Sequence, residues 1–360
     1  MLFVTHSEAD LDRWRVVLGP LQFLMVYLVF SRSELSSRSL GICLNLALLA
    51  SLIVGLVAIA QLTDILPGFR TVLERYYVPS QLHSWDPFHR PTSLLGHYSA
   101  VGAFAVLNYS LALAMAATRH PSFSQSWLSL VMLVNVAAVL ASLTVAPTFG
   151  LLLVTGAVLW YARRVPPHLA MAAGGMVIAL VLLSPFLSGR LAQQQIGFSP
   201  GQVVTIPQSL AFRIQLWEAF FIPALAEHVW LGTGTVIPSE VPEALTNNVD
   251  NEYLGAAFRA GVLGVVLLIG LLVGLAITGW RSRESPAPWR RSLGAASLAY
   301  AVLIATIGIS AEYLTYGGVS QHIAMVVGLL ASYARPQRLP FPLPARVGKE
   351  PTAGWRLGAG

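Results

Sequence analysis

Charged side chains precede a long apolar stretch in the segment 247–261, "NNVDNEYLGAAFRAG". Asp250 and Glu252 stand at its polar beginning. Arg259 follows seven residues after Glu252, which in a helix is two turns, or roughly 10 Å, deeper on the same face. A carboxylate can accept a proton from a reacting hydroxyl, and a guanidinium group can hold phosphate oxygens through two parallel hydrogen bonds. These residue types at this spacing predict a site for an anionic substrate with a proton acceptor beside it.

Two further arginines have apolar neighbours and extend this candidate site. Arg213 lies in a segment of helical periodicity, and Arg90 comes just before an apolar run. Three arginines at the ends of an apolar bundle could hold an anionic head group whose tail lies in lipid. Two alternatives stay open: Arg213 and Arg90 are solvated loop charges, or Arg259 pairs with a carboxylate such as Glu312 and only ties helices together.

The remaining candidates for chemistry are weaker. His97, His228 and His322 are more typical of structural or solvated histidines than of catalytic ones. There is no H-E-x-x-H motif and no acidic triplet, so we expect no metal and no cofactor. The single cysteine, Cys43, allows no disulfide within the chain.

The composition indicates that these residues belong to a membrane protein. Of the 360 residues, 55% are hydrophobic and only 11% are charged, whereas soluble domains carry about 25% charged residues. A helix needs roughly 20 apolar residues to cross the hydrocarbon core. We therefore predict an all-α fold, a polytopic bundle of about nine spans: 16–31, 40–61, 98–118, 127–146, 148–162, 168–188, 253–279, 293–313 and 317–334. We expect Pro147 to break the continuous apolar stretch 127–162 into a hairpin.

The distribution of basic residues predicts the orientation. If the N-terminus lies outside, the inside segments hold 14 of the 22 basic residues and only 3 of the 16 acidic ones. By the positive-inside rule, this arrangement places the loops 62–97 and 189–252 on the extracytoplasmic side. The net charge of +6 then belongs mostly to arginines at the inner membrane surface, which suit anionic lipid headgroups rather than nucleic acid.

The domain organisation follows from these spans. We predict one transmembrane domain over 1–334 and a disordered cytoplasmic tail over 335–360. No cleavable signal peptide is apparent. An outside N-terminus without a preceding span suggests either a chain that begins within a longer ancestral protein or a start site that lies further upstream. In the second loop, the stretch 209–228 places apolar residues on one helical face. It predicts an amphipathic helix on the bilayer or across the mouth of the bundle.

One block of the sequence resembles the O-antigen polymerase and O-antigen ligase family. The family's pattern is an arginine, a tryptophan four residues on, a G-x-G turn, and H-N-x-Y-L before a glycine-bearing span. Two stretches of this chain match it: "RIQLWEAFFIPALAEHVWLGTGT" and, about fifteen residues later, "DNEYLGAAFRAGVLGVVLLIGLL". The matching positions are Arg213, Trp217, Gly232, Gly234, Asn251, Tyr253 and Gly261. A weaker likeness, in "RPTSLLGHYSAVGAFAVLNYSLAL", extends the resemblance to residues 90–334.

The resemblance implies a glycosyltransferase of the bacterial inner membrane that works on its extracytoplasmic side. Its donor would be a glycan on undecaprenyl diphosphate and its acceptor a glycan hydroxyl. A flippase and a chain-length regulator would be partner proteins, and membrane lipids would surround it. The implied substrate-binding residues are Arg90, Arg213, Trp217, Asn251, Tyr253 and Arg259.

Two departures from the pattern refine this expectation. Asp250 stands where the ligases have histidine, which favours a polymerase of exopolysaccharide, capsule or O-antigen type. Asp250 would be its general base and Glu252 the alternate. The segment "TVAPTFG" lacks an arginine that the family carries. The alternatives are an O-antigen ligase and, from another class, a transporter or flippase of an anionic lipid-linked substrate. A transporter needs charged groups along the whole path, and beyond Arg259 and Glu312 the spans offer none.

Overall fold

The computed structural model describes residues 8–77, 90–166, 168–193, 208–234, 241 and 249–334. Every regular element in these ranges is helical, which confirms the predicted all-α class. The tail 335–360 and parts of both predicted loops lie outside the described residues.

The elements follow one another along the chain as a series of long helices with short helical turns between some of them. They are α1 (Glu8–Arg32), α2 (Ser37–Thr63), α3 (Phe69–Tyr77), η1 (Ser93–Leu95), α5 (Tyr98–Ala117), α6 (Gln125–Ala141), α7 (Val145–Ala162), α8 (His168–Gln193), α9 (Gln208–Leu216), the π-helical turn η2 (Trp217–Phe221), α10 (Ile222–Ala226), α11 (Glu252–Arg281), η4 (Ser282–Glu284), α12 (Pro288–Ile307) and α13 (Val319–Ala334).

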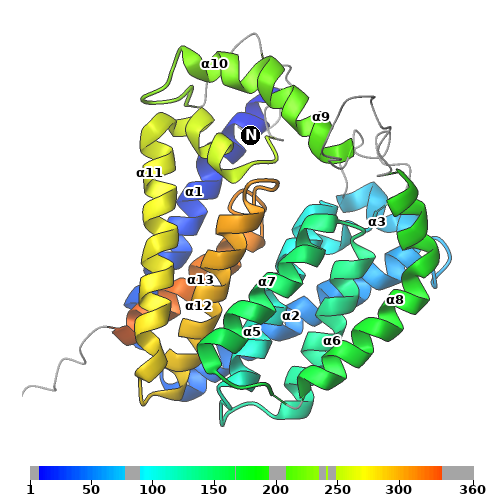
Figure 1. Cartoon of the computed structure of the whole chain (residues 1–360), viewed down its shortest axis with the longest axis vertical. Helices are drawn as coiled ribbons and strands as arrows, with labels where there is room; N and C mark the ends of the chain where they lie inside the picture. Colours follow the sequence, from blue (N-terminus) through cyan, green and yellow to red (C-terminus); the bar gives the residue numbers. More distant parts are fainter. Residues whose placement is uncertain are drawn as a thin grey trace, which may run out of the picture.

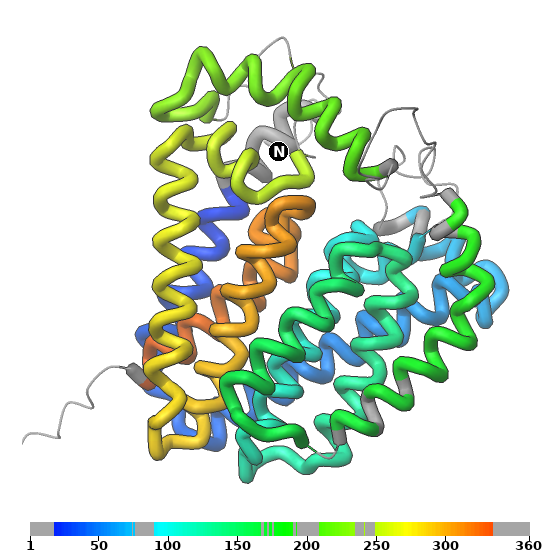
Figure 2. Tube along the Cα trace, in the orientation of Figure 1, coloured from blue at the N-terminus to red at the C-terminus, as the bar shows by residue number. Residues whose placement is uncertain are grey.

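The long helices form two groups joined through α12 (Figure 1). In one group α1 packs on α13 and α11 packs on α12; in the other, α2, α5, α6, α7 and α8 pack together. Helix α12 contacts both groups, through α11 and α13 on one side and through α5 and α7 on the other. Helices α9 and α10 cross one end of the bundle, and the connection from α11 to α12 lies at the opposite end (Figure 2).

Helix α5 is the centre of the second group, and nearly all of its residues are buried. A helix that is apolar on all sides is stable only when other helices surround it. Small residues allow the close approach: a side chain at Gly102 would overlap the ring of Pro147 on α7. This central packing fixes α12, and through it the start of α11.

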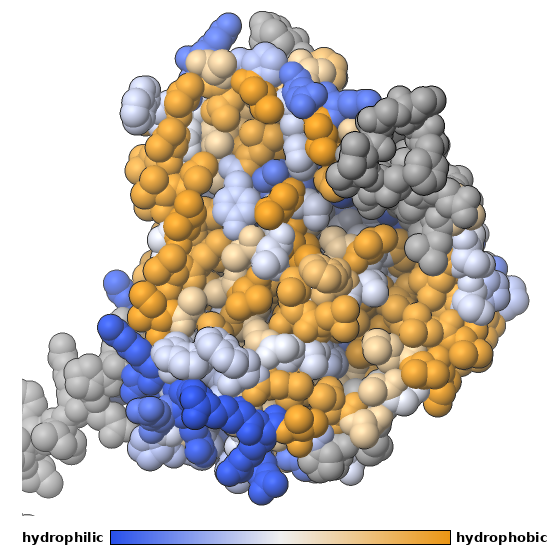
Figure 3. Space-filling model, viewed as in Figure 1, coloured by the Kyte–Doolittle hydropathy of each residue, from blue (hydrophilic) through white to orange (hydrophobic). Residues whose placement is uncertain are grey.

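Within the described residues, four helical segments are long and apolar enough to cross a membrane: α2, α5, α7 and the segment Glu252–Glu284. Helix α11 carries a row of exposed apolar side chains, among them Leu263, Leu267 and Val273. Figure 3 shows such residues as a broad hydrophobic band between two polar ends. A helix overlaps each of the nine predicted positions, but the predicted span 293–313 is wrong at its end: α12 stops at Ile307, where Gly308, a weak helix former, caps it, and 308–313 belong to the connection before α13. Within the described residues the other five helices do not combine the length and hydropathy of a span, so the number of spans stays a prediction.

The predicted break at Pro147 is wrong in position. Helix α6 ends at Ala141 and α7 begins at Val145, so the turn lies over 142–144, with Leu143 at a φ of 50°. Pro147 falls in the first turn of α7. It is tolerated there because the first backbone N–H groups of a helix have no partner within the helix.

The orientation of the bundle can be tested at its two ends. We expect a reporter fused after Arg283, at the α11–α12 connection, to be cytoplasmic, and one fused after Gln202 to be extracytoplasmic, because basic connections stay inside. Paired phosphatase and fluorescent-protein fusions measure this directly. The reverse pattern would contradict the predicted orientation.

Candidate functional site

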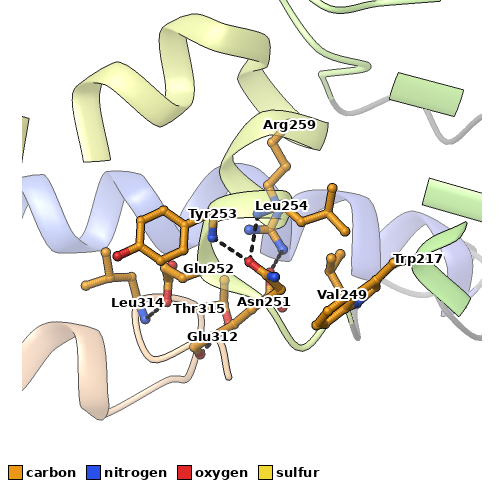
Figure 4. A network of polar contacts seen from close by, with 10 residues as sticks. All are labelled: Trp217, Val249, Asn251, Glu252, Tyr253, Leu254, Arg259, Glu312, Leu314 and Thr315. Atoms are coloured by element: carbon orange, nitrogen blue, oxygen red, sulfur yellow. Dashed lines mark hydrogen bonds and ion pairs between the residues drawn. The ribbon is translucent and has the colours of Figure 1, made fainter. Parts of the chain in front are cut away.

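Most of the predicted residues gather around the beginning of α11, and Figure 4 draws Trp217, Asn251, Glu252, Tyr253 and Arg259 there. Asn251 is the N-cap: its side-chain oxygen accepts hydrogen bonds from the backbone N–H groups of Tyr253 at 3.0 Å and Leu254 at 2.9 Å. An asparagine in this position satisfies N–H groups that the helix itself cannot pair. The N–H of Glu252 donates to the carbonyl of Gly308 at 2.7 Å. The start of α11 is therefore anchored on the connection between α12 and α13.

Asp250 connects this helix start to α9. Its Oδ2 accepts a hydrogen bond from Nε of Arg213 at 2.9 Å, and both side chains are partly exposed, at 31% and 25%. The backbone of Asp250 has a φ of 53°, a left-handed conformation that aspartate tolerates better than most residues. The turn points the carboxylate at α9, so one carboxylate and one guanidinium meet 37 residues apart in sequence.

The predicted amphipathic helix is present, as α9, η2 and α10, and it has a buried and an exposed face. Phe221 is fully buried in a small cluster with Val249 and Phe258, whereas Phe212 on the opposite face is 53% exposed. Trp217 donates from Nε1 to the carbonyl of Val249 at 2.7 Å. The π-helical turn at Trp217–Phe221 adjusts the helix so that both aromatic residues face the start of α11.

Helix α11 is broken one residue after Arg259. Ala260 and Gly261 have non-helical backbone angles, with Gly261 at a φ of 61° and a ψ of −155°. Val262 then donates to the carbonyl of Val229 at 2.8 Å instead of to its own helix. This break leaves the carbonyls of Phe258 and Arg259 without their helical partners.

The G-x-G segment, Gly232 to Gly234, supplies the missing donors. The N–H of Thr233 donates to the carbonyl of Phe258 at 2.7 Å, and that of Gly234 donates to the carbonyl of Arg259 at 3.1 Å. A side chain at Gly232 would lie 2.6 Å from backbone atoms of α11. Gly232 therefore allows two backbones to touch, whereas Gly234 adopts a φ of 65° that favours glycine, so each glycine of the motif has its own structural reason.

Arg259 points back from the break toward the α12–α13 connection. Its Nη2 donates to Oε1 of Glu312 at 3.1 Å, and the two side chains are 25% and 3% exposed. Gly255 makes room for this contact, since a side chain there would overlap Oε1 of Glu312. The pair is the contact expected if Arg259 ties helices together, and it also leaves a quarter of the Arg259 side chain open to a ligand.

Burial sets the charge of Glu312. It raises the pKa of this carboxyl from its ordinary value of 4.5 to about 8, and the negative charges of Glu252 and Asp250 act in the same direction against the opposing effect of Arg259. At neutral pH the protonated acid is therefore well populated. In that state the positive charge of Arg259 is not neutralised and is available to an anion.

Glu252 and Tyr253 hold the helix start in place. Glu252 is 5% exposed, and its Oε2 accepts a hydrogen bond from the N–H of Leu314 at 3.0 Å. The hydroxyl of Tyr253 donates to the carbonyl of Ala305 at 2.7 Å. Glu252 thus bonds the connection that also carries Glu312, and Tyr253 bonds the last turn of α12.

Arg90 reaches the same region through a stack of rings. Its guanidinium carbon lies 3.3 Å from the ring centroid of Tyr98. His97 stacks on Tyr98 at 4.4 Å and on Tyr316 at 5.2 Å between ring centroids, and it caps α5 by accepting from the N–H of Ser99. Arg90 is therefore joined to the α12–α13 connection through the rings of Tyr98, His97 and Tyr316.

The other two histidines have different surroundings. His322 is buried between helices, with Nε2 2.9 Å from the hydroxyl of Tyr300, as suits a structural histidine. His228 is exposed after α10. In the described ranges, no three His, Cys, Asp or Glu side chains are grouped so that they could hold a metal ion.

Comparison with known proteins gives a partial similarity. No family model matches the chain. Over 120 residues, the chain is 29% identical to an O-antigen ligase of Pseudomonas aeruginosa. The match covers 32% of this chain and 28% of that protein's length. The similarity therefore spans less than a third of that O-antigen ligase, and it does not specify a reaction for this chain.

The break in α11 can be tested with one glycine exchange. Gly261→Ala places a side chain within 2.3 Å of the Trp230 carbonyl and strains a left-handed backbone, so we expect a loss of roughly 1–3 kcal/mol in unfolding free energy. Gly270→Ala is the matched control, because nothing lies within 4 Å of that position on the same helix. Thermal unfolding in detergent measures both. Equal stability of the two variants would contradict the packing described here.

Proposed function

We propose that the chain is a glycosyltransferase that polymerises oligosaccharide units carried on undecaprenyl diphosphate, on the extracytoplasmic side of the bacterial inner membrane and without a metal ion. The observation that carries this proposal is the pairing of Arg213 with Asp250 and of Arg259 with Glu312 at one end of an apolar bundle. Two partly exposed guanidinium groups suit a diphosphate, and the apolar surface below them suits a polyprenyl tail. These four residues are called the α11 site below.

The reaction would proceed by direct displacement at the donor sugar. An acceptor hydroxyl oxygen attacks the anomeric carbon, the bond from that carbon to the phosphate oxygen breaks, and the diphosphate leaves with the bonding electrons. The hydroxyl proton goes to the carboxylate of Asp250, which is 31% exposed. Glu252, the alternate base, is buried and already accepts a hydrogen bond from Leu314, which favours Asp250 for this role.

The remaining proposed residues support the same step. Arg213 and Arg259 neutralise the charge that develops on the diphosphate, and Arg90 assists from the start of α5. Trp217, Asn251 and Tyr253 bond the backbone around the α11 site, and we propose that their remaining surfaces contact substrate.

The partial similarity to an O-antigen ligase favours a second candidate function. A ligase would use the same donor and the same arginines but would pass a finished glycan to another acceptor. Purified lipid-linked repeat units separate the two. A polymerase lengthens the glycan on its lipid, whereas a ligase consumes donor only when a separate acceptor is added.

Lysine exchanges test the arginines. A lysine keeps the charge but cannot hold two phosphate oxygens in parallel, so we expect Arg213→Lys and Arg259→Lys each to lower the rate by roughly tenfold or more. Arg163→Lys, at the end of α7, is the matched control and should retain the wild-type rate. Polymer formation from a purified lipid-linked donor is the measurement. Wild-type rates in both variants would assign these arginines to structure alone.

The pKa of Glu312 predicts how donor binding depends on pH. As the pH rises through about 8, Glu312 loses its proton and its negative charge offsets that of Arg259. We therefore expect the KM for the diphosphate donor to rise about three- to tenfold between pH 7 and pH 9. Glu312→Gln removes the ionisable group and should remove this rise. The same rise in the variant would show that another group is responsible.

Asp250 is tested by removing its basicity while keeping its size. Asp250→Asn should still bind the donor but should slow transfer by about 10²- to 10⁴-fold, the usual contribution of a general base. Glu252→Gln should slow transfer less. Asp250→His introduces the residue that the resembling ligases carry and should recover part of the rate. A wild-type rate for Asp250→Asn would place the base elsewhere, with Glu252 and His97 the next candidates.

A further inference from the structure

A second group of arginines lies at the end of the bundle opposite the α11 site. Arg290 and Arg291 stand in the first turn of α12, and Arg283 lies in the preceding turn η4. These three residues are called the α12 arginine cluster. Figure 3 shows the strongly hydrophilic surface at this end, directly next to the hydrophobic band.

The first turn of α12 carries basic residues where helices usually favour acidic ones. The N-terminal end of a helix carries partial positive charge and favours acidic residues or an anion. Helix α12 has no acidic residue in its first turn, and its N-cap, Ala287, provides no side-chain acceptor. Two arginines there add to the positive charge instead of offsetting it. An anion would satisfy both the helix end and the arginines.

No acidic side chain among the described residues forms an ion pair with these arginines. The two ion pairs with both partners in those residues belong to the α11 site. The Nε atoms of Arg290 and Arg291 are buried and have no hydrogen-bond partner there. Buried donors are normally satisfied, so such groups call for a missing acceptor.

Two further buried donors lie beside α12 near the arginine cluster. The hydroxyl of Tyr161, a residue 2% exposed, has no partner in the described chain and lies 3.0 Å from the position of a side chain at Gly294. It is within electrostatic range of all three arginines of the cluster. Tyr161 thus brings an unused donor from α7 to the face of α12 that carries Arg290.

His120 supplies a similar group on the other side. Its ring lies 3.7 Å from that of Trp289 between centroids, and the residue is 2% exposed. Burial, aided by Arg291, lowers the pKa of His120 to about 4, so the ring is neutral at pH 7. Since Nδ1 accepts from the N–H of Ser122, the proton is on Nε2, which has no partner within the described residues. The unsatisfied groups around this turn that can be assigned are therefore all donors.

The depth of the cluster matches that of lipid headgroups. Trp160 and Trp280 stack at 4.5 Å between centroids and are 62% and 38% exposed, and Arg283 lies 5.0 Å over the Trp280 ring. Exposed tryptophans of membrane proteins concentrate at the boundary between hydrocarbon and water. A phosphate group beside these rings would belong to a membrane lipid.

We propose that the first turn of α12, with Arg283, Arg290 and Arg291, binds the phosphate of an anionic phospholipid headgroup. The arginines hold the phosphate oxygens, and the uncapped backbone N–H groups of the turn face the same charge. The basic end of the α11–α12 hairpin is then a specific lipid site and not only a diffuse positive surface. This site is separate from the proposed glycan transfer and does not depend on it.

The experiment compares lipid binding by the full chain in nanodiscs. Wild-type protein is placed in phosphatidylcholine discs with increasing phosphatidylglycerol, and bound lipid is measured by native mass spectrometry together with thermal unfolding. We expect preferential retention of phosphatidylglycerol and a rise in the unfolding temperature. At about a fivefold contribution per arginine, typical of one net hydrogen bond to a ligand, Arg290→Gln/Arg291→Gln should weaken this binding about 25-fold.

Controls separate the site from general charge and from free phosphate. Arg163→Gln/Arg164→Gln removes the same charge from exposed positions and should weaken binding less than twofold. If the first double variant does not fold, Arg290→Gln alone should weaken binding about fivefold. Equal effects of both double variants would overturn the proposal. So would stabilisation by inorganic phosphate in pure phosphatidylcholine discs without any preference for phosphatidylglycerol, because the ligand would then be free phosphate.

Discussion

The break in α11 after Arg259 is the constraint on which the candidate site depends. An unbroken helix would hold the carbonyls of Phe258 and Arg259 in its own bonds and would leave the G-x-G segment nothing to bind. Because the helix breaks, Thr233 and Gly234 dock on those carbonyls, and Val229 binds Val262. The segment after α10 is thereby fixed on α11, and α9 is brought over the helix start, where Arg213 meets Asp250. The break at Gly261, with its φ of 61°, thus allows α11, the segment after α10, and α9 to pack together.

The charges at the helix start are tolerated because each is placed with a partner. A charge near hydrocarbon is costly unless another group or water stabilises it. Arg259 has Glu312 and Arg213 has Asp250, and each guanidinium remains 25% exposed. The carboxyl groups therefore orient the arginines without closing them off. Protonation of Glu312, which its burial favours, makes that orientation compatible with binding an anion.

Much of the fold could be predicted because apolar length and helical periodicity are local properties. Nine apolar stretches correspond to nine helices, and the motif residues around 213–261 do meet at one place. The pairing itself could not be predicted, since Glu312 lies 53 residues from Arg259 and belongs to a short connection without periodicity. The sequence suggested Glu312 only as one possible structural partner. The turn after α6 was misplaced because a proline can begin a helix as well as end one.

Arginines have different partners at the two ends of the α11–α12 hairpin, and this difference bears on function. At the α11 site, Arg213 and Arg259 each have a carboxyl partner, so their guanidinium groups stay oriented when no ligand is bound. A site that must release its product benefits from such an internal partner, because the empty state is then stable. At the α12 arginine cluster, the Nε atoms of Arg290 and Arg291 lack a partner within the described chain. An anion would satisfy these donors, which fits the proposed lipid that stays bound and not a substrate that turns over.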